Sequence, residues 1–197
     1  MVQVMTSRRV IVVDIETTGL DVDTCWPLEI SAVDVASGEA INFVPFITRS
    51  ALGNAEFEAM QVNRYYERGA WRFMSDETMT KACYAELRDM LTGNTLAGSN
   101  PRFDAAVLRR FIGEVWHHRL GDLAVYAAPV MGLGLDSLPG LHTVCEFLGV
   151  ENSDPHSASG DAEATARCFR ELMKRYARTW ADIHSSPADS IPPVVEL

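Results

Sequence analysis

The sequence predicts an α/β domain with a mixed sheet. Three segments of β type come first, within residues 9–48, and helical segments alternate with a further strand after them. Antiparallel strands followed by alternating strand and helix are typical of mixed sheets covered by helices. The chain has 197 residues, of which 47% are hydrophobic and 22% charged, so it carries enough apolar material for a buried core.

The first three strands follow from hydrophobic patterning. Residues 9–16 form a short apolar, β-branched run that ends at Thr17-Thr18-Gly19, as expected of a buried strand. Residues 27–36 alternate between apolar and polar, and residues 40–48 continue as a third strand after a hairpin turn at Ser37-Gly38-Glu39. The sequence therefore predicts an antiparallel meander of three strands.

Helices dominate the remainder of the chain. A helical pattern covers residues 54–68, and Ser75-Asp76-Glu77 begins a helix that runs to Leu91. After a short strand over residues 95–99, Asn100-Pro101 provides an N-cap and a proline for the next helix. The apolar residues of that helix have core spacing: Phe103, Val107, Leu108, Phe111 and Ile112. Two later helices are expected over residues 138–148 and 159–180.

One domain over residues 1–180 and a tail over residues 181–197 are expected. Residues 185–197 hold three of the nine prolines, which favours disorder. No run approaches the roughly 18 apolar residues of a membrane span, and no signal peptide precedes the first strand. The four cysteines are scattered, without a C-x-x-C pair. These features predict a soluble cytoplasmic protein that does not bind membranes.

The charge balance excludes one class of nucleic-acid protein. The chain has 27 acidic and 17 basic residues and a net charge of −10. Such a balance argues against a protein that coats nucleic acid by bulk electrostatics. It is compatible with an enzyme that holds nucleic acid through metal ions.

Four acids and one histidine stand out by position. Asp14 and Glu16 are two residues apart in the first strand, so their side chains project from one face. No Lys or Arg adjoins them, so they either reach water at the strand end or share a cation. Asp104 lies in the first turn of the helix that follows the fourth strand, and Asp161 lies early in the last helix. His156 precedes that helix on a loop.

These residue types together match one chemistry. Hard oxygen ligands suit Mg²⁺ or Mn²⁺, whose coordination is completed by waters and substrate phosphates. Two such ions about 4 Å apart activate a water and stabilise the leaving oxygen in phosphodiester cleavage. A nearby histidine can accept the proton of that water.

Three segments resemble the motifs of the DnaQ-like DEDDh family of 3′→5′ exonucleases. Residues 14–20 read D-x-E-T-T-G-L, residues 100–104 read N-x-x-F-D, and residues 156–161 read H-x-A-x-x-D. Their order and separation also fit the family, and the resemblance covers residues 8–176. It implies a ribonuclease H-like fold with a five-stranded mixed sheet flanked by helices. It further implies two Mg²⁺ or Mn²⁺ ions held by four carboxylates, with a histidine as general base: Asp14, Glu16, Asp104, Asp161 and His156.

The resemblance also suggests substrate contacts. Residues 58–65 are similar to the family's E-A-x-x-V-H-G-I segment, which lines the pocket for the terminal nucleotide, although Asn63 replaces histidine and Arg64 replaces glycine. An amphipathic helix without a ligand role is the alternative. Leu20 and Phe103 resemble apolar residues that wedge or stack on terminal bases, or else belong to the core. The expected substrate-binding residues are Thr17, Leu20, Glu58, Val62, Asn63, Asn100 and Phe103.

The family resemblance implies release of nucleoside 5′-monophosphates from single-stranded DNA or from DNA 3′ ends, in replication or repair. Thr17-Thr18 favours DNA, because oligoribonucleases tend to have D-x-E-M-T-G here. An exoribonuclease of the oligoribonuclease or RNase T type is the alternative, and a catalytically inactive nucleic-acid-binding module is the remote one. Residues 185–197 contain no glutamine, so a Q-x-x-L clamp-binding motif is absent from them. Whether the protein has a polymerase partner does not follow from the sequence.

Overall fold

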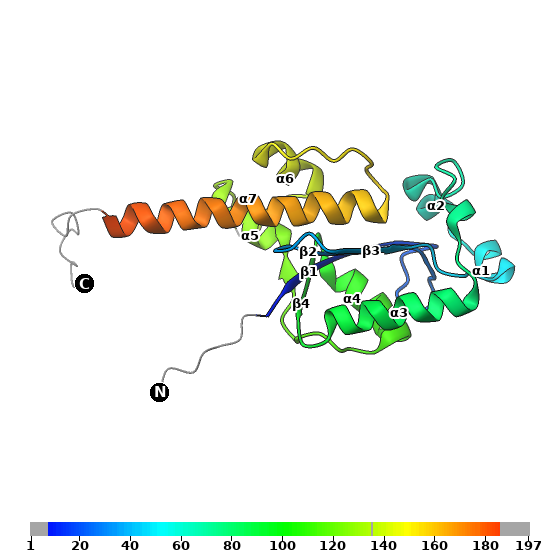
Figure 1. The fold of residues 1–197 in the computed structure, drawn as a ribbon. Helices are drawn as coiled ribbons and strands as arrows, with labels where there is room; N and C mark the ends of the chain where they lie inside the picture. The colour runs from blue at the N-terminus through cyan, green and yellow to red at the C-terminus, as the bar shows by residue number, and fades with distance from the viewer. Residues whose placement is uncertain (1–7, 135, 186–197) are drawn as a thin grey trace, which may run out of the picture.

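A computed structural model describes residues 8–134 and 136–185. Five strands form one sheet in the order β3-β2-β1-β4-β5, with helices on both faces (Figure 1). The central strand β1 (Val10–Thr17) pairs antiparallel with β2 (Pro27–Asp34) and parallel with β4 (Thr95–Gly98). The expected five-stranded mixed sheet is therefore confirmed.

The alternation of side chains along β1 divides the core into two layers. Ile11, Val13 and Ile15 pack with α3 (Glu77–Leu91) and α4 (Pro101–Ile112) on one face of the sheet. Val12 packs on the other face, against the long helix α7 (Ala158–Ser185). Because neighbouring side chains in a strand point to opposite faces, Asp14 and Glu16 lie on the same side as Val12, under α7.

Two shorter helices complete the layer that holds α7. They are α5 (Leu123–Val130) and α6 (Leu141–Leu148), and both contact α7. Figure 1 shows α6 and α7 on the face of the sheet opposite α3 and α4. Within the described residues, no helix has both the length and the apolar character needed to cross a bilayer.

Strand β3 (Ala40–Phe43) is shorter than the predicted strand over residues 40–48. Val44 makes only an isolated bridge with Met74, and Pro45 follows it. A proline has no N–H to donate to a ladder, so the pairing stops there.

The predicted helix over residues 54–68 is wrong in its extent. The structure has α1 (Arg49–Gly53), α2 (Phe57–Asn63) and the 3₁₀ helix η1 (Ala70–Phe73) instead. Arg64 ends α2 in the left-handed conformation, with φ 51° and ψ 37°. Glycine adopts this conformation without a steric penalty, whereas a residue with a Cβ, such as Arg64, adopts it at a cost.

Other boundaries differ for local reasons. Helix α6 starts at Leu141 rather than Leu138, with Gly140 at its N-cap. The stretch expected to be irregular holds β5 (Gly121–Asp122) and α5. Helix α7 continues to Ser185, beyond the expected end near residue 180, so the beginning of the expected disordered tail is helical. Residues 186–197 of that tail lie outside the described residues.

Candidate active site

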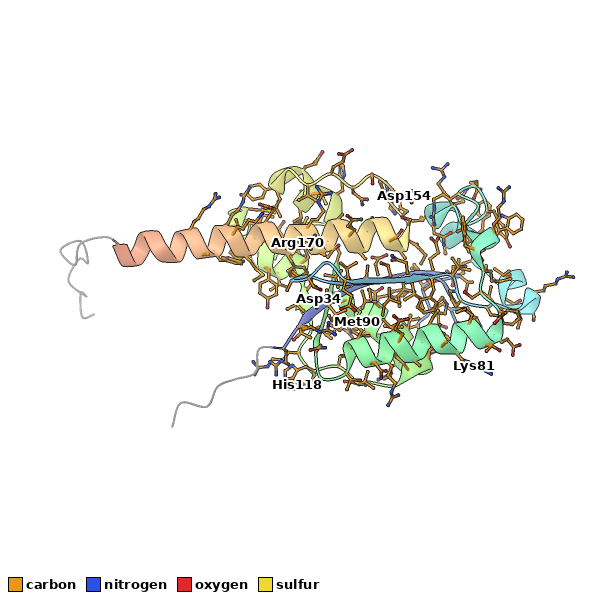
Figure 2. All side chains as sticks on the ribbon, viewed as in Figure 1. Asp34, Lys81, Met90, His118, Asp154 and Arg170 are labelled. Atoms are coloured by element: carbon orange, nitrogen blue, oxygen red, sulfur yellow. The ribbon has the colours of Figure 1, made fainter. Side chains whose placement is uncertain are left out.

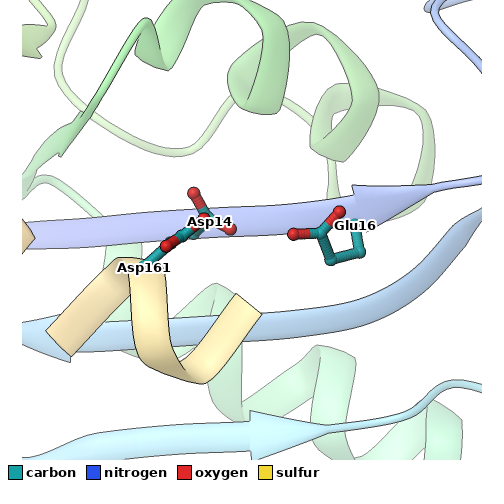
Figure 3. Close-up of side chains that lie close together, drawn as sticks. All are labelled: Asp14, Glu16 and Asp161. Atoms are coloured by element: carbon teal, nitrogen blue, oxygen red, sulfur yellow. The ribbon is translucent and has the colours of Figure 1, made fainter. Parts of the chain in front are cut away.

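The site forms where β1 meets the first turn of α7. Asp14 and Glu16 point from β1 toward the face covered by α7, and Asp161 points back from its first turn (Figure 3). One carboxylate oxygen from each of the three lies within 4.8 Å of the others. Residues of the first strand and of the last helix are thereby brought into one acidic cluster.

Asp104 approaches Asp14 from a second direction. Strand β4 ends at Gly98, next to Val13, so α4 begins beside the part of β1 that holds Asp14. Asp104 is buried in the first turn of α4, and its charge acts on Asp14. It does not belong to the set of three carboxylates within mutual ligand distance. The fourth acid therefore adjoins the cluster through Asp14.

Burial raises the pKa values of Asp14, Glu16 and Asp104, and neighbouring negative charges raise those of Asp14 and Glu16 further. Burial is the main cause for Asp14, followed by the charges of Asp104, Glu16 and Asp161. Burial, with Asp161 next, raises the pKa of Glu16 to about 8. The pKa of Asp104 is also raised, again mainly by burial, against backbone hydrogen bonds that favour the charged form.

A divalent cation fits this donor set. Crowded, half-buried carboxylates are costly when ionised unless a positive charge compensates them. The oxygen atoms on offer are the hard ligands that Mg²⁺, Mn²⁺ and similar ions prefer. The cluster of Asp14, Glu16 and Asp161 is thus suited to hold a divalent metal ion.

His156 lies on the loop that leads into α7, as expected. Its backbone has φ 62°, and its N–H donates to Oδ2 of Asp161 at 3.3 Å. The side chain is exposed. Gly160 makes this tight loop possible, because a Cβ there would lie 2.2 Å from the carbonyl oxygen of Asp154. The backbone thus ties the position of the histidine to one carboxylate of the cluster.

Three residues at the site are not predicted from the sequence. Asn152 donates from Nδ2 to Oδ1 of Asp161 at 2.6 Å, so both oxygens of that carboxylate have a protein partner. Glu29 of β2 lies opposite Glu16 and forms an ion pair with Arg68. Strand pairing could have suggested Glu29, but no local pattern identifies Arg68 or Asn152.

Helix α2 is attached to the first motif at both ends. Oε2 of Glu56 accepts from the N–H of Leu20 at 3.3 Å, and the N–H of Glu56 donates to the carbonyl of Thr18. At the other end Asn63 donates to the carbonyl of Thr17 at 3.1 Å and accepts from the N–H of Tyr65 at 3.0 Å. The buried Asn63 amide therefore positions the first motif from within the protein.

The other expected substrate contacts differ in exposure. Leu20 and Val62 are 76% and 54% exposed, and Glu58 is also exposed. Thr17 is buried, with its hydroxyl donating to the carbonyl of Gly19. Phe103 is half-buried against the core beneath α4. Asn100 is exposed at the N-terminus of α4, but in a left-handed conformation and without the expected side-chain cap.

Comparison with solved structures shows the same fold. The chain is similar to E. coli exonuclease I in complex with a dT13 oligonucleotide, with TM-score 0.66 and 22% identity over 91% of this chain and 44% of that one. The zinc-bound E. coli exonuclease I–ssDNA complex gives TM-score 0.67 and 20% identity, over 91% and 43%. Exonuclease I from Methylocaldum szegediense gives 0.66 and 19%, over 90% and 43%.

The chain thus spans less than half the length of these structures. The expected ribonuclease H-like fold is confirmed. None of the curated proteins matches the chain in sequence. The model of one family, described as exonuclease (RNase T), matches residues 11–169. The match extends from β1 into α7 and includes the whole acidic cluster, and the chain belongs to this exonuclease family, within the DnaQ-like superfamily.

Proposed function

We propose that the protein is a metal-dependent 3′→5′ exonuclease that hydrolyses terminal phosphodiester bonds of DNA and releases nucleoside 5′-monophosphates. The observation that carries the proposal is the convergence of Asp14, Glu16 and Asp161 within 4.8 Å, with Asp104 buried beside Asp14. Exonuclease-family membership supports the reaction class.

The four acids would hold two Mg²⁺ or Mn²⁺ ions. Asp14, Glu16 and Asp161 offer oxygens within one ligand sphere, and Asp104 adjoins them through Asp14. When bound, such ions activate a water and stabilise the leaving oxygen of the phosphodiester. Asn152 keeps the Asp161 carboxylate in a fixed orientation, so the ligand geometry is set before substrate arrives.

His156 acts as the general base in this proposal. It lies on an exposed loop, and its backbone is hydrogen-bonded to Asp161. Because Mg²⁺ prefers oxygen ligands, an imidazole here is better suited to accept a proton than to coordinate the ion.

The terminal nucleotide would bind between the first motif and α2. Leu20 and Val62 provide exposed apolar contacts for a base, which do not depend on sequence. Glu58 offers an acceptor for the 3′ hydroxyl, and Phe103 offers an aromatic surface. Thr17, Asn63 and Asn100 complete the set, with Asn63 acting through the backbone of Thr17.

DNA is the preferred substrate in this proposal. The Thr17-Thr18 pair favours the DNA-directed branch of the family, and the exonuclease I structures that resemble this chain hold dT13 and dA16 oligonucleotides. An exoribonuclease acting on RNA is the alternative. An inactive binding module is disfavoured, because Asp14, Glu16, Asp104, His156 and Asp161 are all present.

Digestion of matched 5′-labelled single-stranded DNA and RNA with Mg²⁺ or Mn²⁺ tests the proposal. We expect a ladder that shortens from the 3′ end one nucleotide at a time, with DNA degraded faster than RNA. A 3′-phosphate should slow digestion, since the pocket receives a free hydroxyl. Asp14→Asn and a chelator serve as inactive controls. Cleavage of a circular strand would indicate an endonuclease instead, and faster loss of RNA would select the exoribonuclease.

A further inference from the structure

One face of α4 lines a groove, and apart from Asn100 and Phe103 the proposed reaction does not use its lining residues. Arg102, Ala105, Ala106 and Arg109 have the i, i+3, i+4, i+7 spacing of a single helix face. The groove has a volume of about 610 Å³, within the range of ligand sites. Its opposite side is formed by the loop after the first motif and by the segment that follows α4.

One end of the groove adjoins the turn of α4 that carries Asp104, although none of the four acids lines it. Asn100 and Phe103 line its near end, and the next residue along α4 is Asp104. Val22 and Asp23, which follow Leu20 in the loop after the first motif, form part of its wall. A polynucleotide whose last phosphodiester lies at the carboxylates can therefore continue over Phe103 into the groove.

Arg110 holds the loop against α4. One guanidinium nitrogen donates to the carbonyl of Val22 at 3.0 Å and to that of Cys25 at 2.6 Å. The loop that forms one side of the groove is thus attached to α4, which forms the other side. A site fixed in this way loses little conformational entropy when a ligand binds.

Cationic side chains follow the groove along its length. Arg102 and Arg109 are exposed, and neither forms an ion pair with any residue in the described part of the chain. Seven positions separate them, which corresponds to about 10 Å along the helix axis. Two acids, Asp23 and Glu114, also line the groove.

The far end of the groove is formed by the segment that follows α4. His118 lines it and is labelled in Figure 2, near the start of β1. The two arginines of the lining are matched in number by its two acids, so the groove is less acidic than the chain as a whole, whose net charge is −10.

We propose that this groove binds the upstream part of a single-stranded DNA substrate, with Arg102 and Arg109 contacting its phosphates and Phe103 contacting a base. The inference rests on the proposed function, because it assumes that a DNA 3′ end lies at the acidic cluster. Single strands bind where cations follow the backbone and aromatic faces receive bases. The groove would make the rate of degradation depend on the length of the strand.

The test compares short and long substrates. For wild type, kcat/KM is measured on a thymidine dinucleotide and on a thymidine decanucleotide, and again for the double variant Arg102→Ala/Arg109→Ala. We expect the variant to lose roughly 5- to 30-fold in kcat/KM on the decanucleotide, as two exposed ion pairs with a stacked strand would give. The loss on the dinucleotide should be several-fold smaller, because its chain ends near Phe103.

Salt dependence gives a second, electrostatic measurement. Each phosphate contact to a single strand contributes about 0.7 to the slope of log affinity against log salt, so the double variant should lower the slope by about 1.4. The charge-matched control is Lys81→Ala/Arg178→Ala, at two exposed cations that do not line this groove. The control should keep both the length dependence and the slope of wild type.

The outcomes separate this inference from the proposed function. If wild type degrades no DNA, the proposed function fails. If wild type degrades DNA but the Arg102/Arg109 variant loses equally at both lengths, or no more than the Lys81/Arg178 control, the groove proposal is overturned while the function stands. If the length-dependent loss in the Arg102/Arg109 variant appears only with RNA oligonucleotides, the groove holds RNA, and the assignment to DNA is also overturned.

Discussion

Glu29 lies directly opposite Glu16 in the antiparallel pairing of β1 and β2. Arg68 pairs with both oxygens of Glu29, donates from Nε to the carbonyl of Asn63 at 2.8 Å, and lies 3.9 Å from Oδ2 of Asp154. One guanidinium thus joins β2, the end of α2 and the loop that carries His156. It also opposes the charges that raise the pKa of Glu16.

Replacement of Arg68 should destabilise the protein. The Arg68 and Glu29 side chains are only 16% and 12% exposed, so Arg68→Ala leaves a carboxylate nearly buried beside Glu16. We expect a loss of roughly 2–4 kcal/mol in the free energy of unfolding, somewhat below the cost of breaking a fully buried pair. Denaturant unfolding of the variant gives this value directly.

A double-mutant cycle with Glu29→Gln isolates the pair. Glu29→Gln in the Arg68→Ala background removes the unpaired negative charge and should recover part of the lost free energy of unfolding. Arg68→Lys should recover a smaller part, because the lysine ammonium cannot contact both carboxylate oxygens as the guanidinium does. Additive effects of the two substitutions would show that the ion pair is not coupled in solution.

A bound metal ion should stabilise the protein, whereas a rise in pH should destabilise the metal-free protein. The pKa of Glu16 is about 8 in the folded protein against an ordinary value of 4.5, so between these values the native state binds more protons than the unfolded state. Without metal, the free energy of unfolding should therefore fall as pH rises from about 5 to about 8. Mn²⁺ requires deprotonated ligands, so its stabilising effect should grow over the same range. Thermal melts with chelator and with Mn²⁺ measure both trends.

Asp14→Asn should weaken the pH trend in the chelator and leave Tm unchanged or higher, because it removes one of the repelling charges. Nuclease activity should fall by orders of magnitude. Asp89→Asn, on the exposed side of α3, is the matched control and should change neither property. A clear drop in Tm for Asp14→Asn, with activity retained, would assign Asp14 a structural role.

Local signals predict most of the elements that build the site. Ile11, Val12, Val13 and Ile15 of the apolar run in β1 are buried, and the side chain of Asp76 caps α3 by accepting from the N–H of Met79. No local pattern predicts strand β5, because it has only two residues and exists through pairing with Ala97 and Gly98. The formation of β5 therefore depends on its tertiary contact with β4 and not on its own sequence.

The residues of the site likewise divide into those that local sequence patterns predict and those that depend on tertiary contacts. The acids of the cluster can be predicted because they occur in short motifs whose order fits a family, and the proximity of Asp14, Glu16 and Asp161 follows from strand and helix geometry. Arg68 and Glu29 are 39 positions apart, and an arginine in a loop carries no local sign of its partner. Contacts of this kind depend on how α2 docks on the sheet.

Gly160→Ala should disturb the loop that carries His156. The added Cβ would lie 2.2 Å from the carbonyl oxygen of Asp154 and 2.8 Å from Oγ of Ser157, so the backbone of the loop must move. We expect a destabilisation of roughly 1–3 kcal/mol together with lower activity at saturating metal. Gly53→Ala is the control, because its Cβ meets nothing within 4 Å; it should leave activity unchanged and stability equal or slightly higher. Equal behaviour of the two variants would show that the loop accommodates a side chain.

His156→Ala should separate proton transfer from metal binding. The contact that His156 makes with Asp161 comes from its backbone N–H, so removal of the imidazole leaves that contact available. If the ring is the general base, kcat should fall by about 10²–10⁴, while the affinity for Mn²⁺ stays near that of wild type. Calorimetric titration of Mn²⁺ into both proteins, beside single-turnover digestion of DNA, measures the two quantities separately.

The backbone conformation of His156 dictates a second variant. At φ 62° an alanine is strained, whereas asparagine tolerates the left-handed region well. His156→Asn therefore keeps the loop geometry without an imidazole, and it should lose as much kcat as His156→Ala. Recovery of activity in His156→Asn alone would mean that the alanine variant fails through its backbone. Loss of Mn²⁺ binding in both variants, as severe as in Asp14→Asn, would instead make the histidine a metal ligand.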